Sequence, residues 1–367
     1  MFFMADYEVG QELCFLGLSV PVLLQVMFRL VSPSIAARTF RTALPYLIAL
    51  SVSFVGNVGD ASSDPVRDTV ILLNTAYGLF LASILASWRD GELWADIMRC
   101  TAIIALPAFL YVAIAHRSDE SWGRWMPYDL QPNWWGMMAL GLAWSSLAWK
   151  NQFVRSIGLA MAIYYLYRTQ SRGSLLGLVP AFILCSGYLI PLTRRKLLAW
   201  VVAGIVAALA LGVDALLGPG DVTGGFADFV ANDLLKLEDP NRGWGTGLTG
   251  RTEAFQEAWD AFRASPLIGN GYSEFGFVHN GYLITAAESG AFALFGLLYL
   301  FWRGLRGYGK AGHWVGIGFI LSYMLTLATY PRTLNINMTA LLFMFVLMRG
   351  IALSYMQRAS PNGWTHS

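Results

Sequence analysis

The sequence predicts an all-α protein, a bundle of about eleven membrane-spanning helices with one long loop outside the membrane. Three observations lead to this fold class. Hydrophobic residues make up 56% of the 367 residues and charged residues only 13%, whereas soluble globular domains carry roughly 25% charged residues. Apolar stretches of the length needed to cross about 30 Å of hydrocarbon recur along the chain. Basic residues gather in alternate loops between those stretches.

The apolar stretches give the expected position of each span. The predicted spans cover residues 13–31, 42–58, 69–87, 97–115, 133–149, 153–168, 173–191, 197–218, 277–301, 312–330 and 339–356. The fifth and sixth are short and nearly contiguous through residues 150–152. We expect a single transmembrane domain over residues 1–367, within which residues 219–276 form the long loop.

The distribution of Lys and Arg predicts the orientation of the spans, because cytoplasmic loops carry an excess of both. Arg194, Arg195 and Lys196 form the densest basic turn, so we place that turn in the cytoplasm. Alternation then puts the N-terminus outside, the C-terminus inside and the long loop outside. Two smaller outer loops are predicted at residues 116–132 and 331–338. The first residues are acidic where a cleavable signal peptide would be basic, so we expect no signal peptide.

Composition and spacing also exclude several classes of site. The three cysteines lie in apolar runs without metal-ligand spacing, and we interpret them as small buried apolar residues: Cys14, Cys100 and Cys185. The four histidines do not cluster, so no metal and no cofactor is expected. There is no P-loop, no dinucleotide fingerprint and no Asp-x-Asp pair. These absences argue against an ATP-driven transporter and against a nucleotide-sugar transferase.

The second half of the long loop, residues 249–264, has the pattern of an amphipathic helix. Phe255, Trp259 and Phe262 follow one another at i, i+4 and i+7 and therefore share a face. This face could pack on the helix bundle, or the helix could lie in the membrane interface. Pro266 ends the helix, and glycines shape the turn that follows.

Three arginines on the acidic outer side are candidates for anion binding: Arg172, Arg251 and Arg332. The planar guanidinium group suits phosphate oxygens. Arg251 would stand at a helix N-terminus, whose partial positive charge favours an anion. Local salt bridges to the outer acids are the alternative interpretation.

His279 stands at the outer start of the ninth predicted span and can accept a proton near neutral pH. A hydrogen-bonded structural histidine is the alternative. Glu288 would lie roughly 13 Å deeper on the opposite helix face, so it is not expected to pair with His279. Glu288 and Arg349 are instead predicted to form a structural ion pair, because both stand about ten residues from the outer end of spans running in the same direction.

Several short motifs occur in a particular order and on one predicted side of the membrane. They are Pro132-Asn133, Ser171-Arg172-Gly173-Ser174, Gly250-Arg251-Thr252-Glu253, Trp259, Pro266-Leu267-Ile268-Gly269-Asn270-Gly271-Tyr272, His279-Asn280-Gly281-Tyr282-Leu283 and Glu288-Ser289-Gly290. In this order they resemble the O-antigen ligase and O-antigen or exopolysaccharide polymerase superfamily of bacterial membrane glycosyltransferases. The resemblance covers roughly residues 120–302.

The resemblance implies a metal-independent glycosyltransferase at the periplasmic face of the bacterial inner membrane, with an undecaprenyl-pyrophosphate-linked glycan as donor. It implies that Arg172 and Arg251 bind the pyrophosphate and that His279 activates the acceptor hydroxyl. Further substrate contacts are assigned to Arg332, Arg124, Asn280, Tyr272 and Glu253. Ligases of this superfamily usually have twelve spans with both ends inside, which differs from the topology predicted here.

Three functions remain open at this point. The amino-acid sequences of the motifs resemble those of exopolysaccharide polymerases more closely, which favours a polymerase that joins lipid-linked repeat units. A ligase onto lipid A core or an O-oligosaccharyltransferase onto protein would use the same chemistry with another acceptor. A transporter of lipid-linked glycans is the third, although the sequence lacks the paired broken helices typical of transporters. Expected partners are the glycan donor, the glycan acceptor and membrane lipids, with a chain-length regulator or export machinery as further candidates and no nucleic acid.

Overall fold

The computed structural model describes most of the predicted spans but not the whole chain. The described residues are 32–57, 65–88, 93–115, 120–121, 124–125, 132–149, 151–169, 171, 174, 176–180, 251–271, 278, 280–328 and 338–359. The chain forms two compact units, one of residues 1–101 with 255–367 and the other of residues 102–254. The boundaries between the units fall within helices α4 and α10.

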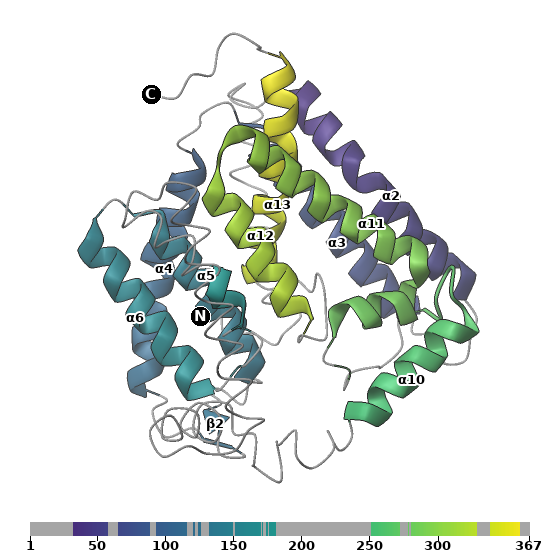
Figure 1. The fold of residues 1–367 in the computed structure, drawn as a ribbon, viewed down its shortest axis with the longest axis horizontal. Helices are drawn as coiled ribbons and strands as arrows, with labels where there is room; N and C mark the ends of the chain where they lie inside the picture. The colour runs from purple at the N-terminus through teal and green to yellow at the C-terminus, as the bar shows by residue number, and fades with distance from the viewer. Residues whose placement is uncertain are drawn as a thin grey trace, which may run out of the picture. The chain divides into compact units, whose positions relative to one another are not determined.

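The first unit is built from segments at opposite ends of the sequence. Its helices are α2 (Pro33–Asn57), α3 (Pro65–Ala86), most of α10 (Arg251–Ala264), α11 (Gly281–Ala311), α12 (Trp314–Leu327) and α13 (Met338–Ala359). Helix α11 packs against α2, α12 and α13, while α3 packs against α2 and α13 (Figure 1). The chain turns between α11 and α12 where Gly312 adopts φ 71° and closes the C-terminus of α11.

Glycines let the helices of this unit approach closely, as is typical of helices packed in membranes. A Cβ added at Gly296 of α11 would lie 2.8 Å from the Cα of Tyr46 in α2. A Cβ at Gly307 would lie only 1.7 Å from the carbonyl oxygen of Gly350 in α13. The side chain of Phe343 then fills the core beside α12, where its ring stacks on Tyr323.

The second unit contains the end of α4 (Leu93–Ala115), α5 (Pro132–Leu147), α6 (Gln152–Thr169) and a pair of antiparallel strands of two residues each, β1 (Glu120–Ser121) and β2 (Arg124–Trp125). The rings of Phe109, Trp135 and Tyr165 join α4, α5 and α6. The Tyr165 hydroxyl donates to the carbonyl of Phe109 at 2.5 Å, which satisfies this buried polar group. Apart from the short strand pair, the regular elements of the described residues are helices.

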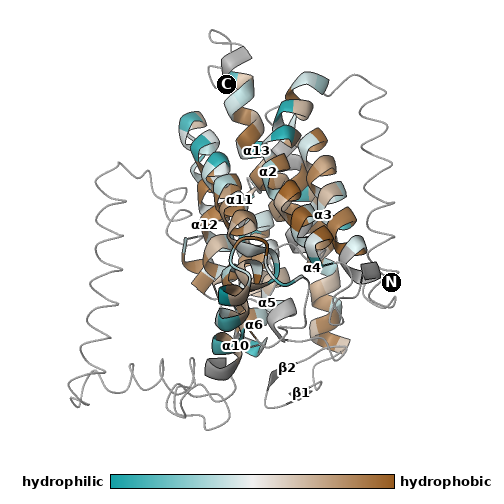
Figure 2. Cartoon of the chain, turned by 90° about the vertical axis from the view of Figure 1, so that its right-hand side faces the viewer, coloured by the Kyte–Doolittle hydropathy of each residue, from teal (hydrophilic) through white to brown (hydrophobic). Residues whose placement is uncertain are grey.

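Four of the described helices are long and apolar enough to cross a membrane: Pro33–Asn57, Thr69–Ala86, Ile97–Ala115 and Gly281–Ala311. Shorter apolar helices cover Phe153–Leu166, Trp314–Leu327 and Leu342–Gln357. Hydrophobic residues run along these helices (Figure 2), and large apolar side chains such as Val55, Ile104 and Phe295 are exposed. Water would penalise such surfaces, whereas lipid would cover them. A helical fold with several candidate membrane spans is therefore confirmed.

Eight of the predicted spans correspond to described helices, with shifted ends. The predicted spans 13–31 and 197–218 lie outside the described residues, and of 173–191 only Ser174 and residues 176–180 are described, as helix. The count of eleven and the orientation stay predictions. One cysteine interpretation is wrong, because Cys100 is exposed on the apolar helix α4 rather than buried.

The predicted ion pair between Glu288 and Arg349 is also wrong. Arg349 is buried, and its Nη1 donates to the carbonyl oxygens of Ala86 at 2.8 Å and Trp88 at 2.6 Å. These carbonyls end α3, where helices leave carbonyl groups without intrahelical donors and carry partial negative charge.

Glu288 lies at the opposite end of the first unit. Its carbonyl accepts from Ser53 near the end of α2, whereas the neighbour of Arg349, Gly350, contacts Gly307 of α11. From the bend at Gly290 to Gly307, α11 rises roughly 25 Å. The prediction failed because the two helices do not begin at the same level: Gly350, only 12 residues after the start of α13, contacts Gly307, which stands 26 residues after the start of α11.

Candidate active site

The predicted site residues around His279 lie at the end of the first unit where α11 begins. Helix α11 is bent there, because Gly290 has φ 75° and ψ 178° and divides it into residues 281–289 and 291–311. A bend frees backbone groups, and here residues 266–271 satisfy them. The amides of Asn270 and Gly271 donate to Ala287 and Glu288, both at 3.0 Å, and the Ala291 amide donates to Pro266 at 2.8 Å. We call these three bonds the backbone latch.

The latch explains why three glycines occur in this part of the sequence. Gly269, Gly271 and Gly290 all have φ between 75° and 79°. A Cβ at Gly269 would lie 2.3 Å from the carbonyl oxygen of Glu288, and a Cβ at Gly290 would lie 2.2 Å from that of Leu267. The predicted role of the first two glycines in shaping a turn is confirmed, while the bend at Gly290 was not predicted.

Polar side chains anchor the latch to two other helices. Ser53 of α2 donates to the Glu288 carbonyl at 2.9 Å. Asn57, the last residue of α2, donates through Nδ2 to the Ser53 carbonyl at 2.7 Å and to the Gly269 carbonyl at 3.4 Å. Asn270 Nδ2 donates to Ala261 of α10 at 2.7 Å and to Ala287 of α11 at 3.0 Å. The ends of α2, α10 and α11 are therefore held together.

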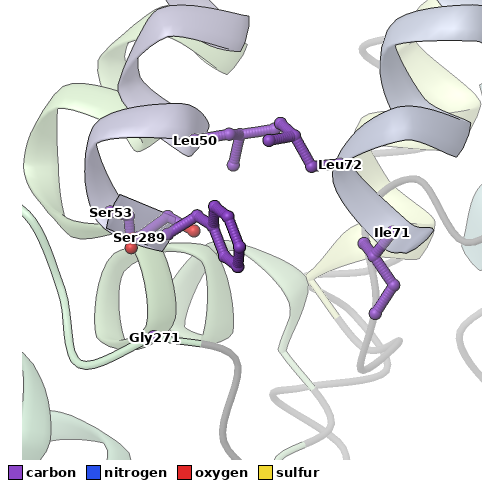
Figure 3. Close-up of a pocket in the computed structure, with 7 residues that line it drawn as sticks. Leu50, Ser53, Ile71, Leu72, Gly271 and Ser289 are labelled. Carbon is purple, nitrogen blue, oxygen red and sulfur yellow. The ribbon is translucent and has the colours of Figure 1, made fainter. Parts of the chain in front are cut away.

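A small cavity lies beside the latch, between α2 and α3. It has a volume of about 30 Å³ and is lined by Leu50, Ser53, Phe54, Ile71, Leu72, Gly271 and Ser289. Leu50 and Leu72 approach one another across it, and the hydroxyls of Ser53 and Ser289 stand on its polar side (Figure 3). This volume suits one water molecule and is too small for a sugar ring.

The first turn of α11 carries the residue after His279. Asn280 is the N-cap, and its Oδ1 accepts from the amides of Tyr282 at 3.1 Å and Leu283 at 3.0 Å. Val278, on the other side of His279, is buried. His279, Tyr272 and Arg332 themselves lie outside the described residues.

The Ser-Arg-Gly motif follows α6 in the second unit. Ser171 and Ser174 are buried and joined by a 3.1 Å hydrogen bond between their hydroxyls. A Cβ at Gly136 in the first turns of α5 would lie 2.3 Å from Ser171 Cβ. Arg172 lies outside the described residues, but its motif packs at the start of α5, where Pro132-Asn133 is found. These two parts of the predicted pattern therefore come together.

Three further candidates are placed by their backbone alone. Arg124 belongs to β2, which contacts α6 within the second unit. Arg251 is the first residue of α10 and Glu253 the third. The predicted helix over residues 249–264 is thereby confirmed, with a start two residues later. Among the described residues, no group of three or more His, Cys, Asp or Glu side chains could hold a metal ion.

Sequence reasoning missed Ser53 and Asn57, which hold the latch from α2. No sequence signal could have found them, because the first spans resemble the superfamily only in hydropathy. Asn270 stood within a quoted motif but had no assigned role. Its two flanking glycines were the available signal, since they indicate a turn with a side chain fixed between them.

The fold and these motifs define a multi-pass membrane protein in which the loop of residues 266–271 is anchored to helix ends. Residues 157–298 match the family described as O-antigen ligase. The match includes the Ser-Arg-Gly motif, α10, the latch and the first half of α11, so the resemblance inferred from the sequence is confirmed. The matched region, residues 157–298, is therefore similar to O-antigen ligases. A search of curated proteins finds no match to the chain.

Proposed function

We propose that the protein polymerises undecaprenyl-pyrophosphate-linked oligosaccharide repeat units at the periplasmic face of the bacterial inner membrane. The observation that carries this proposal is the O-antigen ligase match over residues 157–298, which spans all three proposed catalytic residues. The proposal includes eleven spans in a single transmembrane domain, with the N-terminus outside and residues 219–276 as the periplasmic loop.

The proposed reaction transfers a glycan from one lipid carrier to a second glycan. An acceptor hydroxyl attacks the anomeric carbon of the donor, the bond from that carbon to the pyrophosphate oxygen breaks, and undecaprenyl pyrophosphate leaves with the electron pair. Arg172 and Arg251 bind the pyrophosphate and stabilise the charge that develops on it, a task to which fixed cations are suited. Arg251 acts from the first residue of α10, where the helix dipole adds to its charge.

His279 takes the proton from the acceptor hydroxyl in this proposal. Pyrophosphate is a good leaving group without protonation, so the enzyme must supply a base on the acceptor side, which typically contributes about 10²–10⁴-fold in rate. The Asn280 cap supports this assignment, because it fixes the start of α11, the helix that follows His279 in the chain. Arg124, Arg332, Tyr272, Asn280 and Glu253 are proposed to contact the glycan or the donor phosphates.

The description of the matched family favours a second candidate, a ligase that moves a finished lipid-linked glycan onto lipid A core or protein. Deleting the protein and analysing the lipid-linked glycans separates the two. Accumulation of single repeat units on undecaprenyl pyrophosphate supports the polymerase. Accumulation of full-length lipid-linked polymer refutes the polymerase and supports the ligase.

Purified protein with labelled lipid-linked donor in detergent provides the complementary test. Without a sealed membrane, a transporter has nothing to move between compartments, so formation of a new glycosidic bond under these conditions supports an enzyme. A protein that binds the donor but forms no bond with any glycan acceptor would refute the glycosyltransferase proposal.

A further inference from the structure

Helix α10 presents two different non-polar faces. Ala254 and Ala258 are buried, whereas Phe255 and Trp259 are 37% and 47% exposed. Phe262 joins them with its ring centroid 5.5 Å from that of Trp259. We call Phe255, Trp259 and Phe262 the aromatic stripe. At about 100° per residue the stripe lies roughly a quarter-turn from the alanine face. The buried face of α10 is therefore formed by alanines, while the rings of Phe255 and Trp259 are exposed and that of Phe262 is half-buried.

The remaining side of α10 is polar and faces away from the alanines. Gln256 donates to both carboxylate oxygens of Asp260 at 3.0 Å, and these two residues are exposed. Arg263 is exposed between this polar side and the stripe. The helix therefore has the composition of one that lies flat in an interface, with aromatic rings on one side and charges on the other.

The latch fixes the level of α10 relative to the membrane-spanning helices of the same unit. Its C-terminal end is tied by Asn270 to α11 and by the Gly269 carbonyl to Asn57, the last residue of the span α2. Figure 1 shows α10 beside the bent start of α11. A span ends where the hydrocarbon ends, so α10 is held at the boundary between hydrocarbon and headgroups.

Exposed apolar side chains continue from α11 towards α10. Phe292 and Phe295, which follow the bend in α11, are 58% and 67% exposed on a helix that can cross the membrane. Leu267, whose carbonyl touches Gly290 at the bend, is 57% exposed. The lipid-facing surface of α11 thus extends through Leu267 to the residues that end α10.

We infer that the aromatic stripe of α10 inserts into the headgroup region of the bilayer that holds the protein, at the end of the first unit where α2 ends and α11 begins. Trp is enriched at that depth because its ring is amphipathic, and Trp and Phe are typical of the apolar face of helices that lie in the interface. The partner is the phospholipid boundary itself. The inference does not depend on the proposed glycosyltransferase activity.

Spin labelling tests the inference position by position. Single cysteines at Phe255, Trp259 and Phe262 are introduced into full-length protein in which the three native cysteines are replaced by alanine. Matched controls on the polar side of the same helix are cysteines at Gln256 and Asp260. Each variant is labelled with a nitroxide and reconstituted in nanodiscs of phosphatidylethanolamine and phosphatidylglycerol. A cysteine at Phe295 serves as the lipid-facing reference.

Collision rates with oxygen, which concentrates in lipid, and with a water-soluble nickel chelate decide the outcome. Labels in the stripe are expected to collide more often with oxygen than with the nickel chelate, as the reference label at Phe295 does. Labels at the control positions are expected to collide more often with the nickel chelate. Equal access of nickel to stripe and control labels would overturn the inference by placing the stripe in water. Stripe labels that are immobilised and shielded from both reagents would overturn it by showing that protein, either another segment or a second copy, covers the stripe.

Discussion

Gly290→Ala provides the sharpest test of the backbone latch. Its φ of 75° and ψ of 178° lie in a region that is essentially restricted to glycine, and forcing another residue there costs about 1–3 kcal/mol. The added Cβ would lie 2.2 Å from the Leu267 carbonyl oxygen. Relief of this clash displaces residues 266–268 and weakens the bond from Ala291 to Pro266, worth about 0.5–1.5 kcal/mol. We expect a loss of about 2–4 kcal/mol in stability.

Gly309→Ala is the matched control on the same helix. A Cβ at Gly309 meets nothing within 4 Å, and alanine is favoured over glycine in a helix by about 1 kcal/mol. Both variants are purified in the same detergent, and their thermal unfolding is monitored by size-exclusion chromatography. The Tm should be lower for Gly290→Ala and unchanged or higher for Gly309→Ala. If the two variants unfolded at the same temperature, the assigned strain and the latch itself would be wrong.

Four further predictions concern single side chains. Arg349→Met should destabilise the protein by about 1–3 kcal/mol while Arg349→Lys recovers part of the loss, because the carbonyls that end α3 would lose a donor; thermal unfolding measures this, and an unchanged Met variant would contradict it. Asn280→Ala should cost about 0.5–2 kcal/mol and Asn280→Asp much less, since aspartate keeps the cap; equal losses in thermal unfolding would argue against capping. At Arg172 and Arg251, lysine should leave partial glycan assembly and alanine very little, with normal insertion and purification; near-normal assembly in either alanine variant would remove that arginine from the donor site. His279→Ala should lose most turnover while still binding lipid-linked donor, and EDTA should leave the unaltered protein active; substantial turnover by His279→Gln would exclude the role of base.

Helix positions could be predicted from sequence because they depend on local properties. The span expected at residues 97–115 corresponds to α4 (Leu93–Ala115), since a continuous apolar run is sufficient to define it. The amphipathic helix before Pro266 was found for the same reason. The bend in α11 was missed because Gly290 resembles any glycine in a membrane helix. Its conformation depends on residues 266–271 reaching it, and that contact leaves no periodic pattern.

The candidate site was predicted through motif order rather than geometry. The resemblance indicated Asn280, beside His279, as a substrate contact. Its role as the N-cap of α11 was not predicted and is known only from the structure. Arg349 shows the opposite case, in which reasoning from charge chose a carboxylate partner. Its partners are the backbone carbonyls of Ala86 and Trp88, and because every residue carries a carbonyl, no side chain in the sequence identifies them.

The first unit joins helices from both ends of the sequence, and this has a consequence for biogenesis. Arg349 and its partner Ala86 are separated by 263 residues. At a synthesis rate of about 5–20 residues per second, α3 waits roughly 13–50 s before α13 leaves the ribosome. During that time α2 and α3 sit in the bilayer without α11 and α13, the helices against which they pack. The insertion machinery or surrounding lipids must therefore cover the surfaces of α2 and α3 that later contact α11 and α13, until those helices are inserted.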